Sequence, residues 1–161
     1  MSLNIQKVQK FFASYPTTTF LVVGALSDES KFGFKVLKWY LSHDLTVVPI
    51  NPKSKTIADV PVSANVSAAI RLALGSSDAG IALSFITPPA VTLNTLKELG
   101  RHEGYQQWLR GVWFQPGSFD LSVLDYTDEL GVYDRVVENG DCILVVGEQG
   151  LQSQRSPTPN L

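Results

Sequence analysis

The sequence of 161 residues has the length of one ordinary domain, and its composition is that of a folded protein. Hydrophobic residues make up 44% of the chain and charged residues 17%. This composition excludes a disordered chain, which has low hydrophobicity and high charge. The formal net charge of −2 does not supply the dense positive field that binding to nucleic acids or anionic membranes requires. We therefore expect neither nucleic acid nor a membrane as a partner.

The chain has one cysteine, Cys142, which has no second cysteine for an internal disulfide. Residues 1–10 lack the apolar core of a secretory signal, and no apolar stretch approaches the ~20 residues needed to cross a bilayer. These features predict a soluble protein of the cytoplasm. A mitochondrial location and a homodimer are left open.

The first third of the chain alternates between helical and strand-like patterns. Apolar residues at helical spacing predict an amphipathic helix over 3–12, and a β-branched run over 19–23, ended by Gly24, predicts a strand buried on both faces. A second helical pattern over 33–43 is followed by another β-branched run over 45–50. A strand, a helix and a strand in this order form a βαβ unit, whose right-handed crossover implies a parallel sheet.

The same alternation continues toward the C-terminus. We expect helices over 66–74, 90–100 and 120–129, and strands over 79–85, 111–114 and 142–147, with a further short strand over 132–137 left open. The pattern predicts an α/β fold: a Rossmann-like, three-layer, doubly wound parallel sheet of about five strands in a single domain over 1–150. Residues 151–161 are rich in proline and serine and are expected to form a flexible C-terminal tail.

Ligands of open parallel sheets bind beyond the carboxyl ends of the strands, so the loops after the strands are the candidate site. After the first strand, Gly24 has backbone freedom, Ser27 and the amides at the helix start can donate to phosphate, and Lys31 adds a positive charge. The loop lacks the full dinucleotide fingerprint, because its third position is Leu26, and it lacks a Walker phosphate loop. A strand-to-helix turn without a ligand is the alternative interpretation.

The other three loops add cations and rigid apolar backbone. The second strand ends in Asn51-Pro52-Lys53, which offers a cation where NAD-binding folds offer an acid, and a cation suits a phosphorylated ribose. The loops at 84–90 and 113–120 leave their strands through prolines and would form a rigid lip for an adenine ring or a pantetheine arm. The alternatives are a solvated turn at the second loop, and a simple helix start at Thr87-Pro88.

Five segments in this order resemble the CoA-binding domain family, the stand-alone relatives of the N-terminal domain of the succinyl-CoA ligase alpha subunit. The segments are 22–25 with Ser27 and Lys31, 48–53, 86–91, 113–117 and 141–143. The resemblance spans 8–146 and departs from the family pattern at 105–110, which reads as an insertion, and after Gly147. It implies that coenzyme A lies over the strand ends with its phosphates near the first two loops.

From the loops and the resemblance together we expect a site for coenzyme A or an acyl-CoA. Its residues are Gly24, Ala25, Leu26, Ser27, Lys31, Asn51, Pro52, Lys53, Ile86, Thr87, Pro88, Gln115, Pro116 and Gly117. The sequence contains no Ser-His-Asp order, metal-ligand cluster or pair of carboxylates suited to acid-base chemistry, so we expect no catalytic residues and no metal site. The phosphorylated histidine of the ligase belongs to a second domain, and we expect His43 and His102 to be helix-end histidines.

The function expected on these grounds is that of a binding, sensor or accessory module. The alternatives are an NAD(P)-dependent oxidoreductase or an acyl-CoA-transforming enzyme that uses the same nucleotide site, and an interaction protein whose pocket has lapsed. Cys142 is either a small buried hydrophobe or a redox partner that forms a mixed disulfide with coenzyme A.

Overall fold

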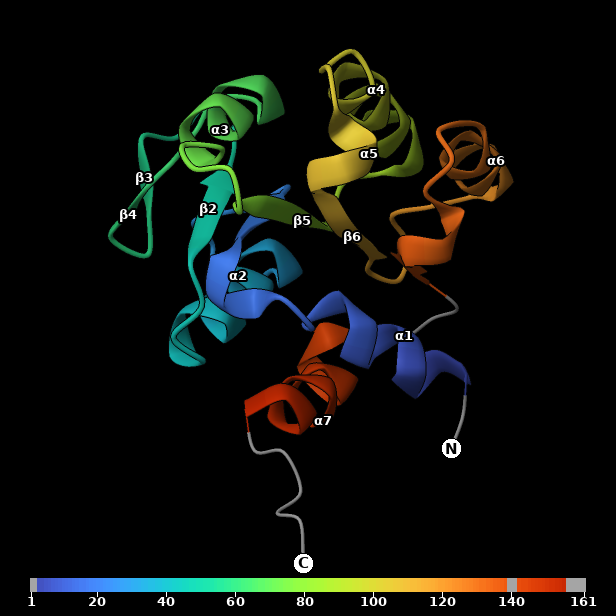
Figure 1. Ribbon diagram of the computed structural model, residues 1–161. Coiled ribbons are helices and arrows are strands. Elements are labelled where there is room, and N and C mark those ends of the chain that lie inside the picture. The colour runs from blue at the N-terminus through green and yellow to red at the C-terminus, as the bar shows by residue number, and fades with distance from the viewer. Residues whose placement is uncertain (1–2, 139–141, 156–161) are drawn as a thin grey trace, which may run out of the picture.

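The protein is built on a five-stranded parallel sheet with the strand order β2-β1-β5-β6-β7. The computed structural model describes residues 3–138 and 142–155. The strands are β1 (Thr18–Val23), β2 (Val47–Ile50), β5 (Gly80–Phe85), β6 (Leu109–Phe114) and β7 (Val136–Val137). The chain runs outward from β1 to β2 and then crosses to β5 on the other side of β1 (Figure 1). The strand order therefore reverses between β1 and β5.

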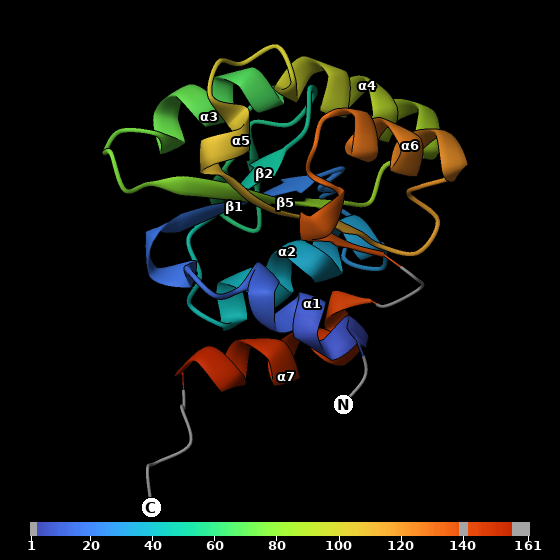
Figure 2. The ribbon, with the colours of Figure 1, turned by 45° about the vertical axis from the view of Figure 1, so that its right-hand side comes forward.

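Helices cover both faces of the sheet, which gives three layers (Figure 2). One face carries α1 (Leu3–Phe11), α2 (Phe32–Ser42) and α7 (Ile143–Arg155), and the other carries α3 (Val66–Ala73), α4 (Pro89–Leu99), the short α5 (Tyr105–Trp108) and α6 (Leu121–Glu129). Two short 3-10 helices span Tyr15–Thr17 and Tyr133–Arg135. Among the described helices, none is both long and apolar enough to span a membrane.

The central strand β1 shows why its sequence has no polar alternation. Phe20 and Val22 belong to the core under α1, α2 and α7, whereas Leu21 and Val23 belong to the core under α3, α4 and α6. Because helices cover both sides of a parallel sheet, consecutive positions such as 20–23 are all apolar. The predicted α/β, doubly wound fold is confirmed, and the predicted helices and strands before residue 130 occur within about three residues of their expected positions.

The last predicted strand, over 142–147, is wrong, because this segment begins helix α7. The fifth strand is instead β7, inside the segment where a further short strand was left open. The buried positions of α7 are Ile143, Gly147, Gly150 and Leu151, which follow a helical period. Two of these four buried residues are glycines, so the buried face of the helix has no apolar period in the sequence. The apolar run 143–146 therefore resembles a strand.

Helix α7 also moves the boundary of the expected C-terminal tail. Residues 151–155 are helical, and Leu151 is fully buried in the core shared with α1 and α2. The expected tail therefore begins after Arg155 at the earliest, and residues 156–161 lie outside the described residues. A tail that starts at residue 151 would include the last turn of this packed helix.

A hairpin between β2 and α3 was not predicted. Strands β3 (Thr56–Ile57) and β4 (Val60–Pro61) pair antiparallel through a turn at Ala58 and Asp59, both with positive φ angles of 51° and 63°. Two-residue hairpins of this kind are normally marked by glycine or asparagine, and neither occurs at these two positions. The turn signal was therefore absent from the sequence.

The close packing of α7 on α1 gives a test of this assignment. A Cβ atom on Gly150 would overlap Cγ1 of Val8, and the valine side chain has little rotamer freedom to yield. We expect Gly150→Ala to lower the free energy of unfolding by about 1–2 kcal/mol, although alanine is the better helix former. Urea unfolding of this variant, compared with Gln149→Ala on the exposed side of α7, measures the effect. Equal stability of the two variants would mean that α7 does not pack on α1 in this way.

Candidate functional site

The carboxyl ends of all five strands lie at one edge of the sheet, because the strands are parallel. The loops after β1, β2 and β5 meet where the strand order reverses, which is the usual place of a ligand in this class of fold. The fourteen predicted site residues all follow strand ends at this edge. They do not, however, line one common cavity.

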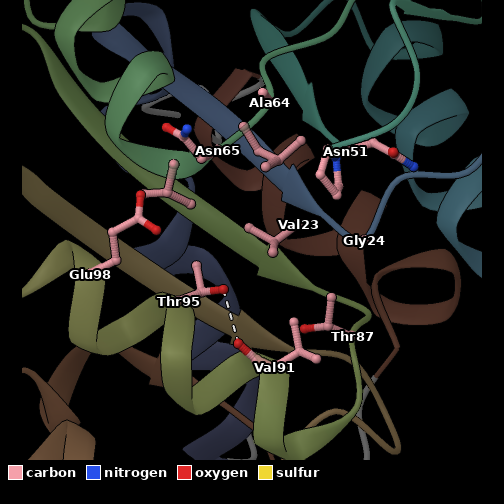
Figure 3. A pocket seen from close by; sticks show the side chains of 12 residues that line it. Val23, Gly24, Asn51, Ala64, Asn65, Thr87, Val91, Thr95 and Glu98 are labelled. Atoms are coloured by element: carbon pink, nitrogen blue, oxygen red, sulfur yellow. Dashed lines mark hydrogen bonds between the residues drawn. The ribbon is translucent and has the colours of Figure 1, made fainter.

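One cavity at this edge has a volume of about 240 Å³ and lies on the face covered by α3 and α4. We call it the switch-point cavity (Figure 3). Four predicted residues line it: Gly24, Asn51, Pro52 and Thr87. Its remaining walls come from Val23, Ile50, Ala64, Asn65, Val66, Val91, Thr95 and Glu98.

Gly24 allows the first and third loops to approach each other. Its φ angle is +96°, in the region that side-chain-bearing residues rarely adopt. A Cβ atom there would lie 3.0 Å from Cγ2 and 3.1 Å from the backbone nitrogen of Thr87. The close approach of the two loops at this side of the switch-point cavity therefore depends on glycine at this position.

Asn51 joins the first and second loops through its side-chain amide. Its Nδ2 donates to the carbonyl oxygen of Ala25 at 2.8 Å, and its Oδ1 accepts from the backbone nitrogens of Lys53 at 2.7 Å and Ser54 at 3.2 Å. The amide is thus engaged by the protein at both ends. We conclude that Asn51 shapes the cavity by holding two loops together.

Glu98 places a carboxylate at the far end of the switch-point cavity from Gly24 (Figure 3). Its Oε2 accepts from the backbone nitrogen of Ser67 at 2.9 Å and from the Ser67 hydroxyl at 2.7 Å. The same hydroxyl lies 2.8 Å from Nε2 of His102. Because an ionised carboxylate only accepts, Ser67 donates its proton to Glu98, and His102 must donate to Ser67. A nucleophilic triad needs the opposite order, with the serine donating to the histidine.

The wall formed by α4 was missed from the sequence. Val91, Thr95 and Glu98 are spaced by four and three residues, which places them on one face of the helix predicted over 90–100. The residues predicted for the site all come from loops at the strand ends. The helical spacing of these three side chains was the signal that would have found them.

The loop between β1 and α2 differs from the expected phosphate loop in its charge. Helix α2 begins without a side-chain cap, and Ser27 and Lys31 are exposed, as the prediction requires. Asp28, however, accepts from the hydroxyl of Ser30 at 2.7 Å and from its backbone nitrogen at 2.9 Å. These hydrogen bonds, with the nearby charge of Lys31, hold the pKa of Asp28 below its ordinary value. The loop therefore carries a stable negative charge beside the open helix end.

A second, smaller cavity of about 90 Å³ lies on the opposite face of the sheet, against α2 and the start of α7. We call it the thiol cavity. It contains three predicted residues and is lined by Phe32, Val36, Ile86, Gln115, Pro116 and Cys142. Ile86 and Thr87 are neighbours in the chain but line different cavities, so the loop after β5 separates the two. The predicted single rim is thus divided between both faces.

The other predicted site residues line neither of these two cavities: Ala25, Leu26, Ser27, Lys31, Lys53, Pro88 and Gly117. Ser27 lines a third hollow, of about 810 Å³, between the loop after β1 and the β3–β4 hairpin. Ala25 is buried, and both lysines are exposed. Among the residues that the structure describes, no group of three His, Cys, Asp or Glu side chains could hold a metal ion. His43 ends helix α2, as expected, with its Nδ1 2.7 Å from the carbonyl oxygen of Trp39 and its ring stacked on that indole.

The comparisons with known proteins show the family and the fold of this chain. A family described as "CoA binding domain" matches residues 18–148. A conserved hypothetical protein from Pyrococcus furiosus is 26% identical with a TM-score of 0.62, covering 80% of this chain and 97% of its own. A hypothetical protein from Pyrococcus horikoshii is 19% identical with a TM-score of 0.70, covering 94% of this chain and 96% of its own. A protein from Thermus thermophilus is 20% identical with a TM-score of 0.69, and the match covers 92% of this chain and 99% of that protein. The search of curated proteins gives no match.

The hydrogen bonds of Asn51 predict a specific stability effect. Asn51→Ala leaves the carbonyl of Ala25 and two backbone nitrogens without their partner, so we expect a loss of about 1–3 kcal/mol in the free energy of unfolding. Amide exchange at Lys53 and Ser54 should accelerate. The control is Asn94→Ala at an exposed position of α4, which should change stability by less than about 0.5 kcal/mol. Unchanged exchange at Lys53 and Ser54 would contradict the role given to Asn51.

Proposed function

Because the chain belongs to the CoA binding domain family, we propose that it binds coenzyme A or an acyl-CoA at the carboxyl ends of its parallel strands. The protein would then act as a binding, sensor or accessory module. The observation that carries the proposal is the switch-point cavity, which lies at the reversal of strand order, beside the uncapped start of α2. A ligand with a nucleoside at one end and a diphosphate next to it matches this arrangement.

The switch-point cavity is the proposed place of the adenosine. Its walls are mostly apolar, from Val23, Ile50 and Val91, with polar side chains at its ends, which is the usual make-up of a small-molecule pocket. The carboxylate of Glu98 at one end repels phosphate but can accept a hydrogen bond from an amino group such as that of adenine. The adenine would therefore lie toward Glu98, and the phosphates toward Gly24.

The start of α2 is the proposed place of the diphosphate. The first backbone amides of a helix and its dipole attract anions, and the N-cap residue Lys31 forms no side-chain cap hydrogen bond with this helix. Lys31 adds a positive charge, while Asp28 and Glu29 in the same loop oppose it. We therefore expect the diphosphate to be bound mainly by backbone amides. Lys53, exposed beside Pro52 at the edge of the cavity, would face the 3′-phosphate of the ribose.

A comparison of ligands at equal concentration tests the proposal. The melting temperature is measured with coenzyme A, acetyl-CoA, NADP, NAD and ADP, because a ligand of the folded state stabilises it by mass action, by about 2.7 kcal/mol at one hundred times its dissociation constant. A selective response to the coenzyme A compounds is the expected result. A selective response to NADP would favour a reductase that uses the same site. No response to any of the five would overturn the proposal.

Charge reversal at Lys53 tests the position of the ribose phosphate. We expect Lys53→Glu to weaken coenzyme A binding by about three- to tenfold at low salt, a modest effect because the lysine is exposed. Dephospho-CoA, which lacks the 3′-phosphate, should bind the variant and the wild type alike. Calorimetric titration measures both ligands, and Lys97→Glu, on the side of α4 that faces α6, is the matched control. If the affinities of coenzyme A and dephospho-CoA fall equally in Lys53→Glu, Lys53 does not contact the 3′-phosphate.

A further inference from the structure

The thiol cavity contains a buried hydrogen-bond donor without a partner. Gln115 is only 3% exposed, and its Oε1 accepts from the backbone nitrogen of Ile143 at 3.0 Å. This bond fixes which end of the amide is oxygen, since a backbone N–H requires an acceptor. The Nε2 group is buried and has no hydrogen-bond partner among the described residues. A buried donor of this kind is costly to leave unpaired.

The cavity around Gln115 offers this donor little else to bind. The other side chains that line it are those of Phe32, Val36, Ile86 and Pro116, which are apolar, and Cys142, whose sulfur is a weak acceptor. A trapped water needs two to four polar partners, and these walls supply one strong donor. The cavity is therefore suited to a small apolar group that brings a single acceptor with it.

A thioester carbonyl has this chemistry. It brings one acceptor oxygen and no donor, whereas an amide would also bring an N–H for which the cavity side chains offer only a weak acceptor. The volume of about 90 Å³ accommodates a short acyl group and excludes a nucleoside. The loop after β5 lies between this cavity, which Ile86 lines, and the switch-point cavity, which Thr87 lines. The start of α2 also borders it, through Phe32.

We propose that the thiol cavity receives the acyl end of a short-chain acyl-CoA, with Gln115 Nε2 donating to the thioester carbonyl oxygen. The inference rests on the proposed function, because it places the second end of the same ligand. The adenosine would lie on one face of the sheet and the acyl group on the other, with the ligand passing over the β5 exit and the start of α2. The protein would thereby distinguish a short acyl-CoA from free coenzyme A.

The carbonyl itself is the variable of the test. Acetyl-CoA and S-ethyl-CoA have the same number of heavy atoms in the chain beyond sulfur, but only the first carries the carbonyl oxygen branch. We expect wild-type protein to bind acetyl-CoA about 2- to 12-fold more tightly than S-ethyl-CoA, the range of one net hydrogen bond. In Gln115→Met, which keeps an unbranched side chain of similar size, the two affinities should become equal. The control Gln107→Met, at an exposed position of α5, should keep the wild-type ratio.

The wild-type comparison needs no substitution, so it holds even if Gln115→Met folds poorly. Tight binding of coenzyme A and S-ethyl-CoA with no gain for acetyl-CoA would overturn this inference and leave the proposed function standing. Failure of all three ligands to bind would overturn both. A wild-type ratio that persists in folded Gln115→Met would also overturn the assignment of Gln115.

The single cysteine supplies an independent measurement. Cys142 lines the same cavity, so an acyl group there should block its alkylation by iodoacetamide. At an acetyl-CoA concentration of about ten times the dissociation constant, we expect the alkylation rate to fall about tenfold. ADP at the same saturation should leave the rate unchanged, because it lacks the arm that reaches the cavity. Equal protection by ADP, or no protection by acetyl-CoA, would contradict the proposed placement.

Discussion

The polarity of the sheet is the constraint on which the other features depend. Five parallel strands end at one edge of the sheet. Because the strand order reverses between β1 and β5, the loops after these two neighbouring strands lead to opposite faces of the sheet and leave a crevice between them. Gly24 and Thr87 occupy that position in close contact, and Asn51 fastens the neighbouring loop to the first. The cavity is thus a consequence of topology, refined by one glycine and one amide.

The same edge opens on both faces of the sheet, and this gives the proposed site its two halves. On the face of α3 and α4, the switch-point cavity ends in the carboxylate of Glu98; on the face of α2 and α7, the thiol cavity contains the unpaired amide nitrogen of Gln115. The start of α2, whose Phe32 borders the thiol cavity, offers backbone amides to an anion. A nucleotide with a long thioester arm has groups that match all three environments in sequence.

The sequence predicted most of the fold, because in each βα unit a continuous apolar run is followed by apolar residues at helical spacing. It failed at α7, where Gly147 and Gly150 contact α1 and α2 without contributing to an apolar pattern; a Cβ on Gly147 would lie 2.8 Å from Cζ2 of Trp39. For the candidate site, the sequence predicted that the loops share one edge of the sheet, but not that they divide between its two faces. The divergence of neighbours such as Ile86 and Thr87 depends on tertiary structure. Glu98 lies on helix α4 and not in a strand-end loop, so only its helical spacing with Val91 and Thr95 points to it in the sequence. Gln115 was selected as a ligand residue without any sign that its oxygen is taken by Ile143.

The most direct test of the site is a titration of isotope-labelled protein with coenzyme A, followed through the backbone amide resonances of its glycines. Gly24 directly follows β1 and Gly33 lies in the first turn of α2, whereas Gly75 and Gly80 lie at the opposite edge of the sheet, before and at the start of β5. If the ligand binds across the switch point, the resonances of Gly24 and Gly33 move and saturate together while those of Gly75 and Gly80 stay in place. Resonances of Gly24 and Gly33 that remain unmoved at saturating ligand would contradict a site at this edge.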